Sequence, residues 1–367
     1  MTIETQIQGL TYRLLQKPAD LDKLEGLFKE SFPEEDFQGV FNRLAHWIET
    51  SPSGPGVQLV VCDGKKIISS LSFLRQTIDG FNKKYTGFLA STAMTTTAYR
   101  GKGIYKNLTR LAFKELPKYG GHFIFGYTVR ESVLKTEIKL GYTLVGDSPV
   151  LALPLNPGKI LQKIPYLSWA SIWTTGIGKW TSKLYLRLNS YKIRYDSSIV
   201  VHDVDEFPKE IEVIAAVKKR FSKYEVLKDS AHLNWKYRGF FKTKEQHHFV
   251  IAKKGSQIVG WGICGKMNMQ GLNGLAILDA SALPEFEDET LSAIVKHQIL
   301  WANKMDMEII GCMVDKNSKL FAVLRAFGFL QTAHRFKTIF FPLVDNLPSY
   351  IFKANNWRHT WGSSDTL

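Results

Sequence analysis

The chain has 367 residues, enough for two domains of ordinary size. Hydrophobic residues make up 44% of it and charged residues 22%, a balance typical of folded proteins that excludes disordered and low-complexity classes. The formal charge of +14 favours anionic partners such as phosphates, nucleic acid or lipid headgroups.

Neither a membrane span nor a secreted, disulfide-rich protein is expected. No apolar run approaches the ~20 residues that a spanning helix needs, and the stretch from Met1 to Glu4 lacks the basic and then apolar profile of a secretory signal. The cysteines, Cys62, Cys264 and Cys312, lie in separate apolar stretches and form no C-x-x-C pair. We therefore expect a cytoplasmic protein with reduced, buried cysteines.

The first half of the chain alternates strands and helices by its hydrophobic periodicity. The elements expected there are a strand at residues 12–15, helices at 20–32 and 41–48, strands at 57–62, 67–77 and 85–95, a helix at 104–115, a strand at 122–129 and a helix at 132–140. Asp63 and Gly64 are a favourable hairpin turn. The three central strands should therefore form an antiparallel meander.

The second half repeats this order of elements after a basic stretch. Between Ser148 and Tyr195 there is no Asp or Glu, which predicts a linker over residues 148–197. The elements expected beyond it are a strand at 199–204, a helix at 209–218, strands at 249–252, 257–264 and 274–281, a helix at 290–304, a strand at 308–314 and a helix at 318–327. The expected domains are residues 1–147 and 198–345, with a tail at 346–367.

A glycine-containing turn, Arg100-Gly101-Lys102-Gly103, joins a strand to a helix in the first half. Glycines let a backbone approach a pyrophosphate without a Cβ in the way, and the free N–H groups of a helix start present partial positive charge to an anion. The strand before the turn ends in Met94-Thr95-Thr96, whose backbone can pair with the amides of an extended ligand as an added strand would.

The segment from Tyr99 to Tyr105 resembles the acetyl-CoA signature of the GNAT N-acetyltransferases, R/Q-x-x-G-x-G/A. The ending Lys139-Leu140-Gly141-Tyr142 is similar to that of the family's core, and Leu324-Arg325-Ala326-Phe327-Gly328-Phe329 is similar to the same ending again. The resemblance implies an α/β (α+β) chain of two GNAT-like acyl-CoA N-acyltransferase domains in tandem. Each would be a mixed, mainly antiparallel sheet flanked by helices.

The resemblance also implies which residues bind the cosubstrate, acetyl-CoA, in the first domain. They are Met94, Thr95, Thr96, Arg100, Gly101, Lys102, Gly103, Ile104 and Tyr105. The second domain carries four carboxylates, Glu285, Glu287, Asp288 and Glu289, where the first has the basic turn, so it should repel a pyrophosphate. We expect one CoA site per chain.

The chain departs from the family pattern at several positions. Tyr105 stands where the motif has Gly or Ala, so its ring either points away from the phosphates or alters CoA binding. Thr97 replaces a usual Pro, Val129 replaces an Asn found in many members, and Thr136 stands at the place aligned with a Tyr that many members use as general acid. The catalytic groups must therefore be sought among other residues.

Amine acetylation needs an uncharged amine, a route for its proton and a donor to the departing thiolate. Glu131 is a candidate proton acceptor, and Tyr127 or Tyr105 is a candidate donor. The structural alternatives are a solvated residue at a helix start for Glu131 and core packing for the tyrosines. The carboxylate of Leu367 is a further candidate, because some tandem GNAT enzymes bring the chain end into the first domain's site.

The sequence also bears on three further classes of ligand: metals, nucleic acid and lipid. No metal is expected, since none of the nine histidines has a metal-ligand spacing and the adjacent His247 and His248 would face opposite sides of a strand. No nucleic acid is expected, because no recognition-helix or RNP-like pattern appears. Residues 159–194 place Trp169, Trp173 and Trp180 beside lysines, which indicates either a brace between domains or contact with anionic lipid.

The sequence thus favours an acetyl-CoA-dependent N-acetyltransferase acting on a small-molecule amine acceptor, with an amino sugar or a nucleotide-linked amino sugar as one class that suits the basic charge. The segment Leu233-Asn234-Trp235-Lys236-Tyr237 resembles an N-W-R-Y stretch of bacterial tandem GNAT proteins often associated with surface-glycan genes. Two alternatives stay open: an aminoacyl transferase of the cell-wall peptide-bridge type, and a degenerate GNAT-fold protein that binds a ligand or membrane without turnover.

Overall fold

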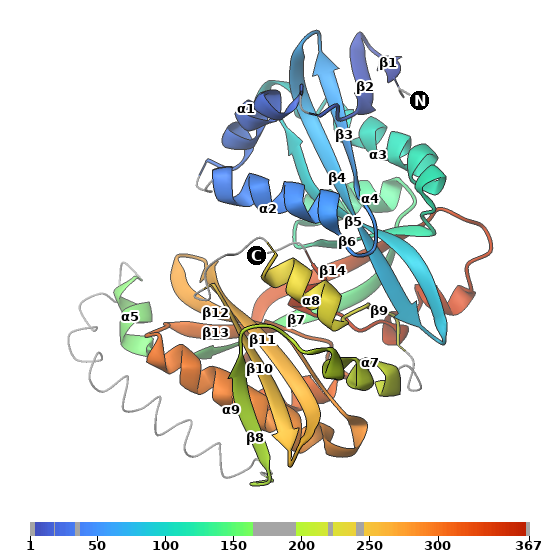
Figure 1. The fold of residues 1–367 in the computed structure, drawn as a ribbon. Coiled ribbons are helices and arrows are strands. Elements are labelled where there is room, and N and C mark those ends of the chain that lie inside the picture. Colours follow the sequence, from blue (N-terminus) through green and yellow to red (C-terminus); the bar gives the residue numbers. More distant parts are fainter. Residues whose placement is uncertain are drawn as a thin grey trace. The chain divides into compact units, whose positions relative to one another are not determined.

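The computed structural model describes residues 4–17, 19–33, 37–163, 196–218, 223–239 and 246–364 (Figure 1). The chain divides into two compact units. Unit 1 comprises Met1–Val145 and Lys337–Asn356, and unit 2 comprises Gly146–Phe336 and Trp357–Leu367.

Unit 1 is built on an antiparallel meander whose last strand also pairs with a parallel strand. Its strands in spatial order are β1 (Glu4–Ile7), β2 (Leu10–Leu14), β3 (Val57–Asp63), β4 (Lys66–Gly80), β5 (Lys83–Thr95), β6 (Phe123–Thr128) and the unit 1 part of β14 (Leu330–Pro342). β6 is parallel to β5. β14 pairs antiparallel with β6 from Lys337 opposite Thr128 to Pro342 opposite Phe123.

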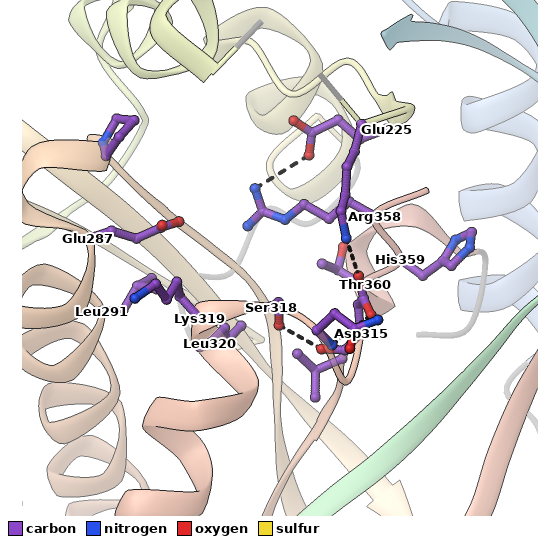
Figure 2. A pocket seen from close by; sticks show the side chains of 14 residues that line it. Glu225, Glu287, Leu291, Asp315, Ser318, Lys319, Leu320, Arg358, His359 and Thr360 are labelled. Carbon is purple, nitrogen blue, oxygen red and sulfur yellow. Dashed lines mark hydrogen bonds and ion pairs between the residues drawn. The ribbon is translucent and has the colours of Figure 1, made fainter. Parts of the chain in front are cut away.

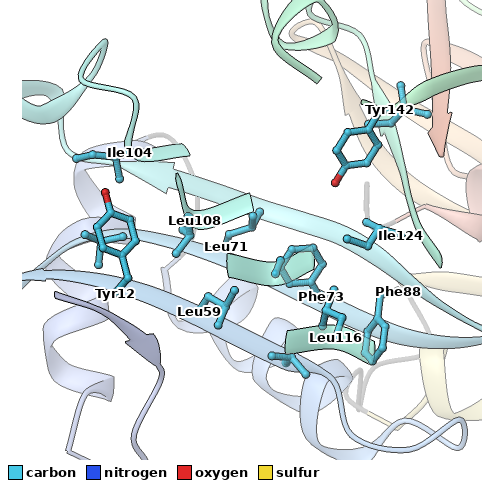
Figure 3. Packing of buried hydrophobic residues seen from close by; sticks show 14 of the residues in the cluster. Tyr12, Leu59, Leu71, Phe73, Phe88, Ile104, Leu108, Leu116, Ile124 and Tyr142 are labelled. Carbon is cyan, nitrogen blue, oxygen red and sulfur yellow. The ribbon is translucent and has the colours of Figure 1, made fainter. Parts of the chain in front are cut away.

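The side chains of β3 alternate between two cores, one on each face of the unit 1 sheet. Leu59 and Val61 pack with Ile104, Leu108 and Ala112 of α3 (Ile104–Glu115), and Figure 3 shows Leu59 and Leu108 within that cluster. On the other face, Val60 and Cys62 pack with Leu24, Leu27 and Phe28 of α1 (Leu21–Ser31). Figure 1 shows α2 (Phe37–Thr50) on the same side as α1. Leu134 of α4 (Glu131–Lys139) packs on the same cluster as α3, so both helices cover this face of the sheet.

Unit 2 repeats the architecture. Its strands in spatial order are the unit 2 part of β7 (Thr143–Pro154), β13 (Ile309–Met313), β12 (Leu272–Ala282), β11 (Gln257–Met269), β10 (His247–Lys254) and β8 (Ile199–Val204). Helix α9 (Glu287–Lys304) packs closely on this sheet because β11 carries glycines beneath it. A Cβ at Gly260 would lie 2.3 Å from the Thr290 side chain.

The remaining elements are short. They are α4 (Glu131–Lys139), α5 (Pro157–Gln162), α7 (Glu212–Lys218), β9 (Glu225–Val226), α8 (Ser230–Tyr237), α10 (Lys319–Ala326), and 3-10 turns at Thr97–Tyr99, Leu116–Tyr119, Lys209–Ile211, Pro284–Phe286, Ser349–Phe352, Ala354–Asn356 and Trp361–Ser363. The expected fold class, two GNAT-like α/β domains with mainly antiparallel sheets, is confirmed. The sequence analysis missed β1, β7, α5, β9, α8 and β14.

The two units exchange their last strands, so their limits differ from those expected. Residues 148–154, placed in a linker, continue β7 and pair with β13 in unit 2, from Val150 opposite Met313 to Pro154 opposite Ile309. Residues 337–345, placed in the second domain, belong to unit 1. The expected tail is likewise divided at Asn356. The buried strand after Ser148 was predicted to be a linker because this segment contains prolines and lacks acidic residues.

Two expectations fall outside the described residues: the tryptophans of residues 159–194, which lie beyond Lys163, and the carboxylate of Leu367. Among the helices that the structure describes, none combines the length and apolarity needed to cross a lipid bilayer.

Candidate functional site

The two parallel strands of unit 1 separate at their carboxyl ends. β5 and β6 pair only from Gly87 opposite Phe123 to Leu89 opposite Phe125, although β5 continues to Thr95 and β6 to Thr128. Beyond Leu89, the edge of β5 is therefore available to an extended ligand that could pair with it.

A β-bulge in β5 lies where the strands separate. Ser72 of β4 faces Ser91 and Ser70 faces Met94, so Thr92 and Ala93 together oppose the single residue Leu71. Thr92 adopts a φ of 47°, which is rare for a β-branched residue. Because a bulge bends its strand and increases the local twist, it accounts for the divergence of β5 from β6.

The glycine turn follows the carboxyl end of β5 after the 3-10 turn Thr97–Tyr99. Gly101 and Gly103 have φ values of 77° and 75°, in the left-handed region that favours glycine. Gly103 is the N-cap of α3 and offers no side chain to the first N–H groups of the helix. A Cβ built on either glycine meets no heavy atom of the described residues within 4 Å. The turn thus presents unprotected backbone donors to open space.

The basic side chains of the turn fold back over its start. The Nε of Arg100 donates to the Thr95 carbonyl at 3.0 Å. The Lys102 ammonium lies 4.9 Å from the centre of the Tyr99 ring. Two cations therefore stand beside the open glycines, close enough to add positive charge for an anion.

Some of the residues predicted to bind the ligand through their backbone already use these backbone groups in hydrogen bonds within the protein. Thr96 donates its N–H to the Ile68 carbonyl at 2.9 Å, and the Met94 carbonyl accepts from the Ser69 hydroxyl at 2.7 Å. Because hydrogen-bonded pairs alternate along antiparallel strands, the backbone of Thr95 points away from β4. Thr95 is the residue best placed to pair with a ligand, with Arg100 as the present partner of its carbonyl.

The side chains of Met94 and Ile104 belong to the two hydrophobic cores, each being 3% exposed. Any ligand contact of these residues would therefore be made by their backbone. A side-chain substitution at either position would therefore change core packing and would not remove a ligand contact.

Tyr105 turns away from the glycine turn. Its hydroxyl donates to Oε1 of Glu137 on α4 at 3.1 Å, and its ring packs against the core beneath α3. The structure thus places the ring where it does not fill the space beside Gly101 and Gly103.

Glu137 is the titratable group that sequence reasoning missed. It is 5% exposed, and its Oε2 has no hydrogen-bond partner among the described residues. Burial raises the pKa of this carboxyl to about 7, and burial also raises the pKa of the Tyr105 hydroxyl. A carboxyl with a pKa near neutrality can gain or lose a proton at physiological pH.

The residues predicted to be catalytic lie at the carboxyl end of β6 and just after it. Tyr127 is half-buried on β6, with its ring 6.2 Å from that of Phe125 in an edge-on arrangement. Glu131 is exposed in the first turn of α4. The hydroxyl of Thr136, the position aligned with a general acid, donates to the Ser132 carbonyl at 3.1 Å instead.

Unit 2 has the same construction, but its opening is filled by the chain itself. β12 pairs with β13 only from Gly274 to Ile277, and a register shift leaves Leu278 as an extra residue on β12. Thr360 forms an antiparallel bridge with Val314, and Arg358 donates to the Ala280 carbonyl at 2.7 Å. The tail occupies the space that a ligand would need.

A cavity of about 320 Å³ lies beside the tail in unit 2 (Figure 2). Its charged side chains are largely paired: Lys223 lies 2.8 Å from Asp315 and Arg358 lies 3.5 Å from Glu225. Glu287 at the start of α9 and Pro284 in the preceding 3-10 turn also line the cavity. Because neighbouring carboxylates neutralise these positive charges, the cavity does not favour binding of a pyrophosphate, unlike the glycine turn of unit 1.

The tail is held by α8, the helix of the Leu233–Tyr237 stretch. The Lys236 ammonium donates to the carbonyls of Gly362 and Ser364, at 2.6 and 2.7 Å. The Asn234 side chain bonds both backbone groups of Phe207, at 2.9 and 3.0 Å. In this chain the stretch therefore anchors two segments of unit 2.

The comparisons with known proteins agree with this architecture. No protein-family model matches the sequence, and no curated protein matches it. A tandem GNAT protein from the clavulanic acid biosynthesis pathway is similar in structure over 92% of this chain and 100% of its own, with a TM-score of 0.59 and 11% identity.

Two other solved structures are similar over most of the chain. A GCN5-related N-acetyltransferase from Anabaena variabilis covers 91% of this chain and 73% of its own, with a TM-score of 0.60 and 12% identity. N-Myristoyltransferase from Saccharomyces cerevisiae with bound myristoyl-CoA covers 99% and 85%, with a TM-score of 0.59 and 11% identity. The chain therefore has the tandem GNAT fold.

Proposed function

We propose that the chain is an acyl-CoA-dependent N-acyltransferase with one active site, in unit 1, and acetyl as the default acyl group. The observation that carries the proposal is the opening between β5 and β6 together with the uncapped, basic glycine turn that follows β5. Unit 2 has the same opening but fills it with the residues around Thr360.

The cosubstrate would be bound mainly by backbone groups. Its pyrophosphate would lie at the N–H groups of Gly101 to Ile104, where the helix start and two cations favour an anion. Its pantetheine amides would pair with β5 at Thr95, as an added strand. This arrangement directs the thioester toward the carboxyl end of β6, where Tyr127 and Glu131 follow.

The reaction transfers the acyl group from sulfur to a neutral amine, so the amine must lose a proton and the thiolate must gain one. We assign proton acceptance to Glu131, which is exposed in the first turn of α4, and donation to Tyr127. The pair of Tyr105 and Glu137 is the other candidate for holding a proton, because its carboxyl has a pKa of about 7.

The acceptor is proposed to be a small amine. The charge of +14 suits an anionic acceptor such as a nucleotide-linked amino sugar, which the proposal therefore includes as its first class to test. The similar folds include both an acetyltransferase and a myristoyltransferase, so acyl chains of several lengths belong in the same screen.

The proposal is tested by calorimetric titration of the full chain with acetyl-CoA and longer acyl-CoAs, followed by a thiol-release screen across amines. One saturable site and amine-dependent thiol release are expected. Binding without release for any amine would favour a degenerate binding protein. Absence of binding by every acyl-CoA would refute the proposal.

A further inference from the structure

Three side chains of unit 2 converge at the edge of its sheet. Asp203 lies on β8, His248 on β10 and His297 on α9. Oδ1 of Asp203 is 2.6 Å from Nε2 of His297 and 3.0 Å from Nε2 of His248. The three donor atoms all lie within 4.8 Å of one another.

The His248 ring is held firmly with its Nε2 directed at this point. The residue is 9% exposed, and its ring stacks on Trp301 with the centres 4.5 Å apart and the planes 3° from parallel. Its Nδ1 lies 4.0 Å from the buried Sγ of Cys264. A proton on Nδ1 would leave the lone pair of Nε2 free to bind a ligand.

Nε2 of His248 lies 3.0 Å from Oδ1 of Asp203 but forms no hydrogen bond of good geometry with any described residue. A buried nitrogen without a partner is costly unless a ligand satisfies it. The hydrogen bond from His297 to Asp203 accounts for one of the two contacts of this carboxylate, whereas the contact with His248 leaves Nε2 poorly satisfied.

We propose that Asp203, His248 and His297 bind one divalent transition-metal ion, for which Zn²⁺ is the best fit. Two imidazoles and one carboxylate are ordinary zinc ligands, at about 2.0–2.2 Å from the ion. Donor atoms of a tetrahedral site are then about 3.4 Å apart. The His297 ring lies nearly parallel to that of His248, with the centres 5.7 Å apart, so the more exposed His297 and Asp203 would have to reorient to bring all three donors to one ion. Asp203 is 62% exposed, which leaves the fourth position open to water.

The ion would fasten the edge of the sheet. β8 is the outermost strand of unit 2 and pairs with β10. A metal joining β8 and β10 to α9 would make opening of this edge more costly, so binding should raise the stability of the folded chain.

The experiment titrates ZnCl₂ into the full-length chain after dialysis against EDTA, by calorimetry and thermal unfolding. Cobalt(II) chloride in place of zinc gives a visible absorption band as a spectroscopic signature. One equivalent of Zn²⁺ should bind and raise the melting temperature. His297→Ala and Asp203→Asn, both at partly exposed positions, should each weaken zinc binding at least about tenfold and remove the cobalt band.

His202→Ala is the matched control, because His202 is exposed on the same strand and its side chain points to the opposite face of the sheet from that of Asp203. It should bind zinc like the unsubstituted chain. Circular dichroism confirms that each variant is folded. Absence of stoichiometric zinc binding, or equal affinity in all three variants, would overturn the proposal and leave a hydrogen-bonded triad. Both results are independent of whether the chain transfers acyl groups.

Discussion

The Tyr105 hydroxyl donates to the Glu137 carboxyl at 3.1 Å, and this contact joins the first turn of α3 to α4. Tyr105 stands where the GNAT motif has a small residue, so its orientation decides whether the glycine turn can receive an anion. Because the ring is drawn toward Glu137, the space beside Gly101 and Gly103 stays open. A departure from the motif is thus accommodated inside unit 1.

Glu137 should make stability depend on pH. Its pKa is about 7 when folded and near 4.5 when unfolded, so between these values the folded state keeps a proton that the unfolded state has lost. Stability should therefore fall as pH rises from 5 to 8, by about 2–3 kcal/mol. Glu137→Gln should remove this part of the slope in urea unfolding. Glu131→Gln, on the same helix but exposed, should keep it, and parallel profiles for the two variants would contradict the assignment.

Substitution of Gly103 should weaken acyl-CoA binding without unfolding the protein. Asparagine tolerates the positive φ of 75°, whereas valine would add backbone strain. Gly103→Asn should weaken binding at least about tenfold in calorimetry, because its side chain occupies the space proposed for the pyrophosphate. Gly255→Asn, at a φ of 60° with equally open surroundings in unit 2, is the control. Equal affinities for the two variants would place the site elsewhere.

The buried pair of Lys228 and Asp279 should be essential to unit 2. These side chains are 7% and 1% exposed, and Thr360 of the tail bonds both of them. Lys228→Met leaves an unpaired buried carboxylate and should cost about 3–5 kcal/mol of unfolding free energy. Adding Asp279→Asn should recover part of that loss.

The control for this pair is Lys319→Met, which breaks an ion pair with Asp288 between side chains more than half exposed. It should change stability by less than about 1 kcal/mol. If Lys228→Met were equally mild, the tail would not be held by this pair.

The strand exchange should prevent the first half of the sequence from folding alone. A fragment of residues 1–147 lacks the part of β14 that pairs with β6 from Lys337 to Pro342. It would expose the edge of β6 and the apolar residues that β14 covers, so it should aggregate or unfold without cooperativity. A dispersed proton NMR spectrum and a cooperative melt of this fragment would show that β14 is dispensable.

Local features of the chain were predictable because local chemistry determines them. The hairpin at Asp63-Gly64, the alternation along β3 and the turn from Arg100 to Gly103 follow from backbone preferences and side-chain periodicity within a few residues. The limits of α3 were expected at residues 104–115 and are observed there. These features suffice to indicate the tandem fold and the place of a candidate site.

The partners of distant segments were decided only by the tertiary structure. β7 and β14 are each divided between the two units, and packing decides where each division falls. The Tyr105–Glu137 contact joins two helices, and the cluster of Asp203, His248 and His297 joins two strands and a helix. No spacing along the chain encodes these contacts, because burial and strand pairing bring such residues together after the local elements have formed.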